Sequence, residues 1–501
     1  MKKTSFDIPK EVADIAYKLE KGGFEAYLIG GCTRDMLLGR KPKDWDITTN
    51  AKPEDIQKLF DNTFYENNYG TVGVVNEETE DETLKVVEIT PYRLENTYSD
   101  FRRPDSVTFS EKLEDDLKRR DFTVNAIAMC IRIKDKGTGK KSLVEIVDLH
   151  KGQEDLEQSV LNTIGSAEDR FSEDALRMLR GIRLATELDF ILNPDVEKAI
   201  QKHGNKLKKI SSERIRDEFV RIIMSSKPAD GLKLAQKLGL LEIILPEIIE
   251  GLGIEQNQAH SFDVWEHSLR TLQHSAKKDF PLEVRISAIF HDIGKPRSRR
   301  WSEQKKDWTF YGHDVIGSRV TAKILTRLKF PVKQLEKITK LVRWHMFFSD
   351  TEQITLSAVR RMVANVGKEN IWDLMDLRAC DRIGTGRPKE SPYRLRKYHS
   401  MVEEAMHDPI SVNMLKISGG KIIEVTRETP GPRIGLILHA LLDEVLEDPK
   451  RNTSEYLEER ALEMAKMDEK TLKKLGDKGK ETKEAEEMAK VKDIRKKYWV
   501  E

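Results

Sequence analysis

The chain of 501 residues is long enough for about three or four domains and a sizeable buried core. Its 87 lysines and arginines nearly cancel its 86 aspartates and glutamates, so net charge alone does not indicate a nucleic-acid partner. The three cysteines suggest no disulfide framework and no apolar stretch could span a membrane, so we expect a cytoplasmic protein without membrane contact.

Helical and strand patterns alternate over residues 1–150, which predicts a domain built on a mixed sheet. Beyond this region the hydrophobic period is helical almost throughout, and glycines and prolines mark the breaks. The sequence therefore predicts an α+β fold, with a mixed-sheet domain followed by helical parts at residues 151–250, 251–390 and 391–501. After about Asn452, lysine and glutamate dominate and predict a solvated helix or a partly disordered tail.

A glycine pair followed by two aspartates is the strongest local pattern. Gly30 and Gly31 follow an apolar strand, where their small size lets the backbone approach a ligand closely. Asp44 and Asp46 are two residues apart, so on an extended segment both carboxylates project from one face. Hard oxygen ligands held in this way suit Mg²⁺ that also grips substrate phosphates. Either fragment alone is more often a plain turn or surface pair, but together they predict a phosphoryl-transfer site.

A second charged motif occupies residues 119–126. Its Arg120, Asp121 and Asn125 could bind phosphate and ribose hydroxyls. The same residues could equally mark a charged helix start before an apolar strand.

A third motif occupies residues 173–180. Helical spacing puts Asp174 and Arg177 on one face of a predicted helix, with Glu173 four residues before Arg177. An intrahelical salt bridge is the simpler interpretation of this spacing. The functional interpretation is a protein edge that hydrogen-bonds an incoming base.

An ordered set of histidines and aspartates follows in the second half of the chain. Imidazole and carboxylate groups together suit divalent transition metals, and ligands on successive helices could hold one or two ions. A lone histidine is usually a surface or core residue, but an ordered series predicts a metal centre. The candidate ligands are His267, His291, Asp292, His313, His345 and Asp381.

These motifs together resemble the class II tRNA nucleotidyltransferase and poly(A) polymerase family, in the bacterial form that carries an HD domain. The resemblance extends from about residue 21 to about residue 452. It implies a nucleotidyltransferase head at 1–150, a neck and body with a nucleobase-template motif at 151–250, an HD metal-binding domain at 251–390 and a helical C-terminal tail at 391–501.

The resemblance also implies roles for individual residues. Asp44 and Asp46 would be catalytic and would bind two Mg²⁺ ions, while the HD ligands would hold a divalent transition metal of unknown identity. Thr33 stands where the family usually has valine, which affects packing rather than chemistry. The residues implied to contact the nucleotide are Gly30, Gly31, Arg34, Arg120, Asp121, Asn125, Glu173, Asp174, Arg177 and Arg180.

The implied reaction is template-independent addition or repair of the 3′-terminal CCA of tRNA from CTP and ATP. The RNA 3′-hydroxyl would attack the nucleotide α-phosphate in line, and the HD domain could add phosphohydrolase activity. Poly(A) polymerases and CC-adding or A-adding enzymes share every motif and stay open as alternatives. A metal phosphohydrolase with a nucleotide-binding head, or an RNA-binding protein without turnover, are rivals from other classes. The oligomeric state is not indicated.

Several weaker features complete the sequence-based predictions. Residues 92–104 resemble the flexible loop of the family, and Glu88 is a candidate third carboxylate at the end of a predicted strand. His260 could contact the substrate of the HD domain. Two basic clusters, at 206–209 and 297–300, could bind tRNA phosphates or be solvated faces.

Overall fold

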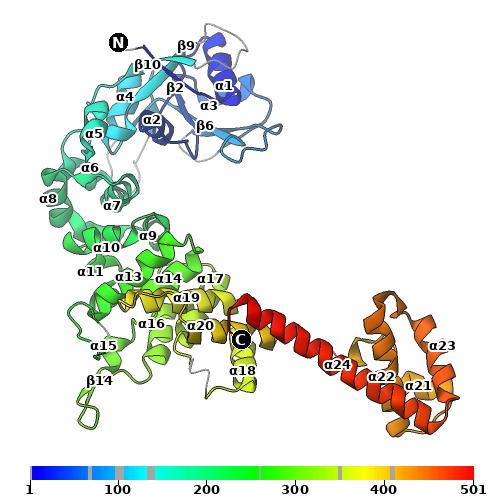
Figure 1. Cartoon of the computed structure of the whole chain (residues 1–501). Coiled ribbons are helices and arrows are strands. Elements are labelled where there is room, and N and C mark those ends of the chain that lie inside the picture. Colours follow the sequence, from blue (N-terminus) through cyan, green and yellow to red (C-terminus); the bar gives the residue numbers. More distant parts are fainter. Residues whose placement is uncertain are drawn as a thin grey trace. The chain divides into compact units, whose positions relative to one another are not determined.

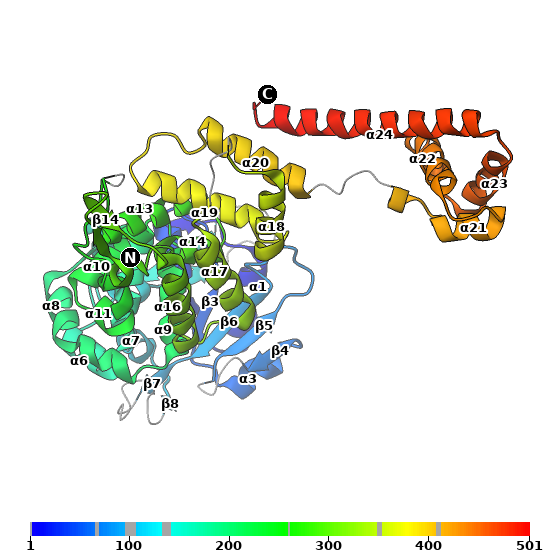
Figure 2. The same ribbon diagram turned by 90° about the horizontal axis from the view of Figure 1, so that it is seen from below.

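The computed structural model describes residues 3–65, 70–95, 107–132, 142–258, 261–347, 353–406 and 412–500. The chain divides into two compact units (Figures 1 and 2). The first comprises Met1–His345 with Asp376–Arg387, and the second comprises Met346–Met375 with Pro388–Glu501. Every predicted catalytic, nucleotide-binding or metal-binding residue belongs to the first unit.

An eight-stranded mixed sheet forms the N-terminal part of the first unit, with the order β1-β10-β9-β2-β3-β6-β5-β4 (Figure 1). The strands are β1 (Lys3–Phe6), β2 (Tyr27–Leu28), β3 (Asp46–Thr49), β4 (Thr63–Tyr65), β5 (Val72–Val75), β6 (Val86–Pro91), β9 (Ala128–Arg132) and β10 (Ser142–Val147). Strands β3 and β6 run parallel, and the other neighbouring pairs are antiparallel. Because β3 is hydrogen-bonded on both sides, Asp46 at its first residue sits on a rigid element.

Short helices pack around this sheet. They are α1 (Lys10–Lys21), α2 (Gly31–Leu37), α3 (Pro53–Leu59), α4 (Leu113–Lys118) and the 3₁₀ turn η1 (Thr123–Asn125); a separate hairpin joins β7 (Arg93–Glu95) and β8 (Val107–Phe109). Helix α1 is amphipathic, and its apolar side chains share one core with β3, β5 and β6. That core holds Val12, Ile15, Ala16, Leu19, Ile47, Val72, Val87 and Ile89.

The rest of the first unit is mainly helical. Its helices are α5 (Gly152–Gln158), α6 (Ala167–Glu173), α7 (Leu176–Leu188), α8 (Pro194–His203), η2 (Gly204–Lys209), α9 (Ser212–Met224), α10 (Pro228–Lys237), α11 (Leu241–Ile244), α12 (Pro246–Ile249), α13 (Val264–Lys277), α14 (Leu282–Phe290), α15 (Lys295–Ser298), α16 (His313–Arg327) and α17 (Val332–Trp344). Two short two-stranded sheets interrupt them, β11 (Val160–Leu161) with β12 (Ile191–Leu192), and β13 (Arg300–Ser302) with β14 (Asp307–Thr309). The predicted α+β fold, with a mixed-sheet head and a helical body, is confirmed.

The second unit is helical in its described parts. It contains α18 (Leu356–Val366), α20 (Tyr393–Met406), η3 (Val412–Met414), α21 (Gly419–Thr426), α22 (Pro432–Glu447), η4 (Pro449–Arg451), α23 (Ser454–Ala465) and α24 (Glu469–Lys497), while α19 (Ile371–Gly384) passes from it into the first unit. The segment after Asn452 is therefore helical. Helix α24 packs closely on α22. The two backbones approach so closely that a Cβ atom added at Gly479 would lie 2.1 Å from the His439 carbonyl oxygen. None of the helices in the described ranges combines the length and apolar character needed to cross a bilayer.

Candidate active site and metal centre

The predicted glycine turn lies directly against both aspartates. Gly30 precedes α2 with a φ of 82°, a conformation that favours glycine. A Cβ atom at Gly30 would lie 3.0 Å from Asp46 Oδ2, and one at Gly31 would lie 3.4 Å from Asp44 Oδ1. Thr33 Oγ1 donates to the Gly30 carbonyl at 3.0 Å and ties the turn to the first turn of α2. The two motifs therefore form one local site.

A third carboxylate adjoins this pair. Glu88 on β6 is the register partner of Asp46 on the parallel strand β3, and both residues line the same cleft. Burial, followed by the negative charges of Asp44 and Glu88, raises the pKa of Asp46 to about 7, although Arg120 opposes the effect. Three carboxylates brought together in this way form a donor set of hard oxygens that fits a divalent cation.

The raised pKa of Asp46 has a consequence that can be tested by pH titration. Below pH 7 this carboxyl must lose a proton before it binds a cation, so the affinity of the site for a divalent cation should fall about tenfold for each unit by which the pH is lowered. As the pH rises from about 4 to about 7, the metal-free folded state should lose stability, because it holds a proton that the unfolded chain releases. A divalent-cation affinity that stays constant from pH 8 to pH 5.5 would contradict this assignment.

Buried Asp116 on α4 holds both arginines of the second motif. Its Oδ1 accepts hydrogen bonds from Arg119 Nε and Nη2 at 2.8 and 2.6 Å, and its Oδ2 accepts from Arg120 Nη2 at 3.0 Å. The same Oδ2 accepts from Thr48 Oγ1 at 3.2 Å, and Thr48 lies two residues after Asp46 on β3. Although burial opposes it, the two guanidinium groups lower the pKa of Asp116. Asp116 was not predicted from the sequence, although its helical spacing to both arginines could have indicated it.

We expect Asp116→Asn to raise the KM for the nucleotide substrate implied by the sequence by about tenfold or more, with a smaller change in kcat, because the variant loses the charge that orients both guanidinium groups. Steady-state kinetics would measure this split. Thr48→Val removes one hydrogen bond and leaves both ion pairs in place, so its KM should stay close to that of the wild type. A lower melting temperature of Asp116→Asn with an unchanged KM would assign Asp116 a purely structural role.

Polar side chains also connect the three motifs to one another. Asp121 Oδ2 accepts from Arg180 at 2.7 Å. Burial acts to raise the pKa of Asp121, but the charges of Arg180 and Arg177 outweigh it and lower this pKa to about 2. Arg34 Nη1 donates to Asn125 Oδ1 at 2.8 Å, which joins the glycine turn to the second motif.

The third motif is not one continuous helix, and the prediction of a single helical face is wrong. Helix α6 ends at Glu173, Asp174 has extended backbone angles and α7 begins at Leu176. The break is stabilised because Asp174 Oδ1 accepts the Leu176 amide at 3.0 Å. Arg177 still forms an ion pair with Glu173 and donates to the Arg119 carbonyl at 3.0 Å.

A helix further along the chain adds a residue to this motif. Arg214 on α9 pairs with Asp174 at 2.6 Å. Because Arg214 lies forty residues away in sequence, its pairing was not apparent from local spacing.

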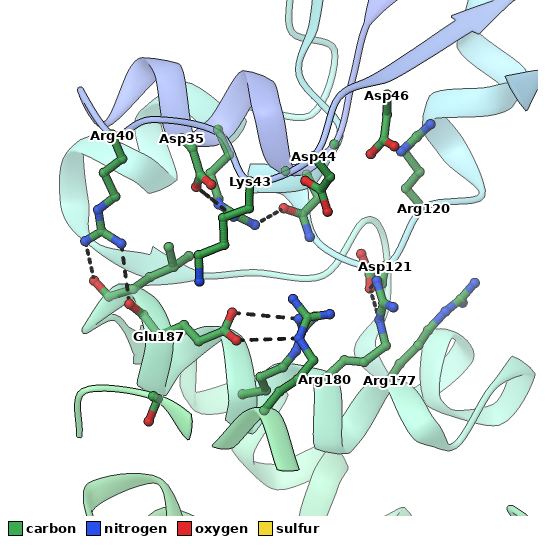
Figure 3. A pocket seen from close by; sticks show the side chains of 18 of the residues that line it. Asp35, Arg40, Lys43, Asp44, Asp46, Arg120, Asp121, Arg177, Arg180 and Glu187 are labelled. Atoms are coloured by element: carbon green, nitrogen blue, oxygen red, sulfur yellow. Dashed lines mark hydrogen bonds and ion pairs between the residues drawn. The ribbon is translucent and has the colours of Figure 1, made fainter. Parts of the chain in front are cut away.

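A cleft of about 870 Å³ separates the sheet residues from the helices α7 and α9 (Figure 3). Asp44 and Asp46 line one side, and Arg177 and Arg180 extend from a helix on the opposite side. Every residue predicted to contact nucleotide lines this cleft except Glu173, which lies behind Arg177. The lining also contains charged residues that were not predicted, among them Arg40, Lys41, Lys43, Arg183, Glu187 and Arg221.

The predicted HD ligands form a second, buried cluster. Asp292 lies at its centre, with Oδ2 at 3.1 Å from the Nε2 atoms of both His267 and His291. Its Oδ1 lies 3.4 Å from His313 Nε2 and 3.6 Å from His345 Nε2.

A second carboxylate and the backbone complete this cluster. Asp381 Oδ1 lies 3.3 Å from His267 Nε2. The Nδ1 atoms of His291, His313 and His345 lie 2.7 to 2.9 Å from backbone carbonyl oxygens, which turns their Nε2 atoms toward the centre. Nitrogen and carboxylate donors that converge in this way fit divalent transition metals. His260 and residues 96–104 of the predicted loop lie outside the described residues.

Three family profiles match the chain in succession. The "Poly A polymerase head domain" matches residues 26–162, the "Probable RNA and SrmB- binding site of polymerase A" matches 189–252, and the "HD domain" matches 260–383. The last two thus cover the helical body and the histidine cluster.

Curated relatives and solved structures agree with these profiles. The chain is 32% identical to the CCA-adding enzyme of Leuconostoc mesenteroides, over 91% of this chain and 97% of that protein. It is 34% identical to an A-adding tRNA nucleotidyltransferase of Deinococcus radiodurans (68% and 76%) and 31% identical to a CC-adding tRNA nucleotidyltransferase of Thermus thermophilus (84% and 89%). The crystal structure of the Bacillus stearothermophilus CCA-adding enzyme in complex with CTP is similar with a TM-score of 0.58 at 27% identity, over 91% of this chain and 98% of that chain.

Proposed function

The chain belongs to the tRNA nucleotidyltransferase and poly(A) polymerase family, and we propose that it builds or repairs the 3′-terminal CCA of tRNA from CTP and ATP in the cytoplasm. The observation that carries the proposal is the contact of the Gly30–Gly31 turn with Asp44 and Asp46, opposite a helix that presents Arg177. Nucleotidyl transfer is assigned to residues 1–150 and 151–250, phosphohydrolysis to 251–390 and tRNA binding to 391–501.

Within the cleft, each group of side chains has one task. Asp44 and Asp46, with Glu88 beside them, would hold Mg²⁺ ions, which neutralise charge on the triphosphate and favour ionisation of the RNA 3′-hydroxyl. Arg34 and Arg120 would bind the phosphates in the orientation required for in-line attack on the α-phosphate, with pyrophosphate leaving. Positioning and charge neutralisation would then supply most of the rate enhancement.

Base selection is assigned to the helical side of the cleft. The Glu173 ion pair and the Arg119 carbonyl hold the Arg177 guanidinium in a fixed orientation at the cleft, where it would face a base edge. We expect Arg177→Ala to lower kcat/KM for CTP and ATP by about 100-fold and to relax discrimination against UTP and GTP. Glu173→Ala, which frees Arg177 without removing it, should relax discrimination with a smaller loss of rate. Competition assays with all four nucleotides would measure both, and unchanged selectivity in Arg177→Ala would refute the assignment.

The experiment that tests the proposed function uses tRNA that lacks CCA, incubated with each nucleotide separately and with both together. CTP alone should add two residues, CTP with ATP should add CCA, and ATP alone should add little. A product that stops at CC when ATP is present would favour a CC-adding enzyme. Addition of A only to tRNA that already ends in CC would favour an A-adding enzyme, and a long A-tail would favour a poly(A) polymerase.

The buried His and Asp cluster supports a second activity, metal-dependent phosphohydrolysis of nucleotide or RNA ends. A divalent transition metal held there would supply an activated water as nucleophile. Lys295 Nζ lies 2.7 Å from Asp292 Oδ2 and adds a positive charge beside the centre, where a substrate phosphate would need one.

A further inference from the structure

A hairpin rich in aromatic and basic residues projects from the helices around the histidine cluster. It comprises residues 299–311, includes β13 and β14, and extends beyond α15 in Figure 1. Four basic residues against two acidic ones give this segment a net charge of +2, whereas the whole chain carries +1. We call this segment the aromatic hairpin.

The aromatic rings of the hairpin are held in place by neighbouring side chains but keep much of their surface exposed. Trp301 and Trp308 pair across the strands with ring centroids 5.2 Å apart, and the Arg299 guanidinium covers the Trp308 ring at 3.6 Å. Trp301 is nevertheless 49% exposed and Tyr311 is 74% exposed. Large exposed aromatic side chains beside cations form a surface on which unpaired bases stack while their phosphates are neutralised.

The basic side chains are placed along the same surface. Lys305 Nζ lies 2.8 Å from the Tyr311 hydroxyl and 5.3 Å from the centre of its ring. Arg300 and Lys306 are exposed on the strands and at the turn of the hairpin. The alternation of rings and cations matches the alternation of bases and phosphates in a single strand better than it matches an apolar protein partner.

The second strand of the hairpin is connected to the metal cluster and to the residues beside it. The segment lies between Asp292 and His313 in sequence, and the Phe310 carbonyl within it accepts from His313 Nδ1 at 2.7 Å. Asp307 Oδ2 accepts the Gln258 amide at 3.1 Å, and Gln258 is two residues from Gln256, which accepts from Lys295 at 2.6 Å. A strand bound on the hairpin would therefore lie close to the cluster.

We propose that the aromatic hairpin is a platform for single-stranded RNA, which presents a phosphorylated RNA end to the His and Asp cluster. Bases stack on Trp301 and Tyr311, and Lys305 and Lys306 contact the phosphates. The delivery role rests on the phosphohydrolase activity proposed above, whereas RNA binding by the hairpin does not.

The test measures binding of a short, unpaired oligoribonucleotide with a 3′-phosphate to the full chain, with EDTA present so that no hydrolysis occurs. Trp301→Ala and Tyr311→Ala should each weaken binding by about tenfold, and Trp301→Phe should restore most of it. Lys305→Gln with Lys306→Gln should reduce the slope of log K against log salt by about 1.4, since each phosphate that is no longer neutralised by a lysine lowers the slope by about 0.7. Trp372→Ala is the matched control, because Trp372 is an exposed tryptophan on α19 and lies outside both the hairpin and residues 391–501.

The possible outcomes separate the two claims. Unchanged binding in Trp301→Ala and Tyr311→Ala, or an equal loss in Trp372→Ala, would overturn the platform. If the variants that lose oligonucleotide binding also lose tRNA binding in the nucleotide-incorporation assay to the same extent, the claim that the hairpin delivers RNA to the cluster would be overturned. A wild-type protein that binds the oligonucleotide through the hairpin and hydrolyses no phosphate ester would refute the phosphohydrolase and support the platform.

Discussion

Asp44→Ala and Asp46→Ala are each expected to lower the rate of CMP incorporation into tRNA by about 10³-fold or more. Each variant removes a carboxylate from a set that adjoins the Gly30–Gly31 turn, so the cations would no longer be held against the triphosphate. Removing one such carboxylate costs several kcal/mol of transition-state stabilisation, and about 1.4 kcal/mol corresponds to tenfold in rate. Single-turnover incorporation of labelled CTP would measure the effect.

Folding and the second site provide the controls for these variants. Asp46→Asn should be at least as stable as the wild type at pH 8 without metal, because it removes a buried negative charge that its neighbours disfavour. Activity at the His and Asp cluster should be unchanged. Near-wild-type incorporation by Asp44→Ala would show that the cleft has been assigned the wrong chemistry.

The second large effect is expected at the histidine cluster. The double variant His291→Ala/Asp292→Ala should reduce hydrolysis of 2′,3′-cyclic nucleotides to background, because Asp292 contacts all four histidines and His291 is one of them. Its content of bound transition metal, measured by elemental analysis, should fall in parallel. Nucleotide incorporation should persist, since the substituted residues do not line the cleft between the sheet and α7.

His274→Ala is the matched control for this variant, because His274 lies on α13 with His267 but outside the cluster. It should retain both hydrolysis and metal. Equal hydrolysis by the wild type and the double variant would show that the HD domain has a structural role and is not catalytic.

The sequence predicted those parts of the site that depend on short-range spacing. The glycine pair after a strand and the two aspartates are local patterns, and the structure brings Gly30, Gly31, Asp44 and Asp46 together as expected. The prediction that one extended segment carries both aspartates is wrong, because Asp44 lies in a bend before β3 and only Asp46 is on the strand. Glu88 was placed near the end of a strand, but its alignment with Asp46 required the parallel pairing of β3 with β6. Such pairing is set by the topology of the whole sheet.

The features that were missed depend on distant partners or on competing local interactions. The break at Asp174 arises because its side chain caps the Leu176 amide, an alternative that helical periodicity does not reveal. Arg214 reaches Asp174 from another helix, and Asp116 connects two arginines to the catalytic strand. The hairpin β13–β14 was expected to be helical, since strands of three residues are too short for a clear period.

The most direct test of the account is a crystal structure of the full chain with Mn²⁺ and a non-hydrolysable analogue of CTP. We predict anomalous density for Mn²⁺ between the carboxylates of Asp44 and Asp46, with the triphosphate against Gly30 and Gly31 and the base facing Arg177. Manganese confined to the His and Asp cluster, with the nucleotide bound outside the cleft, would contradict it.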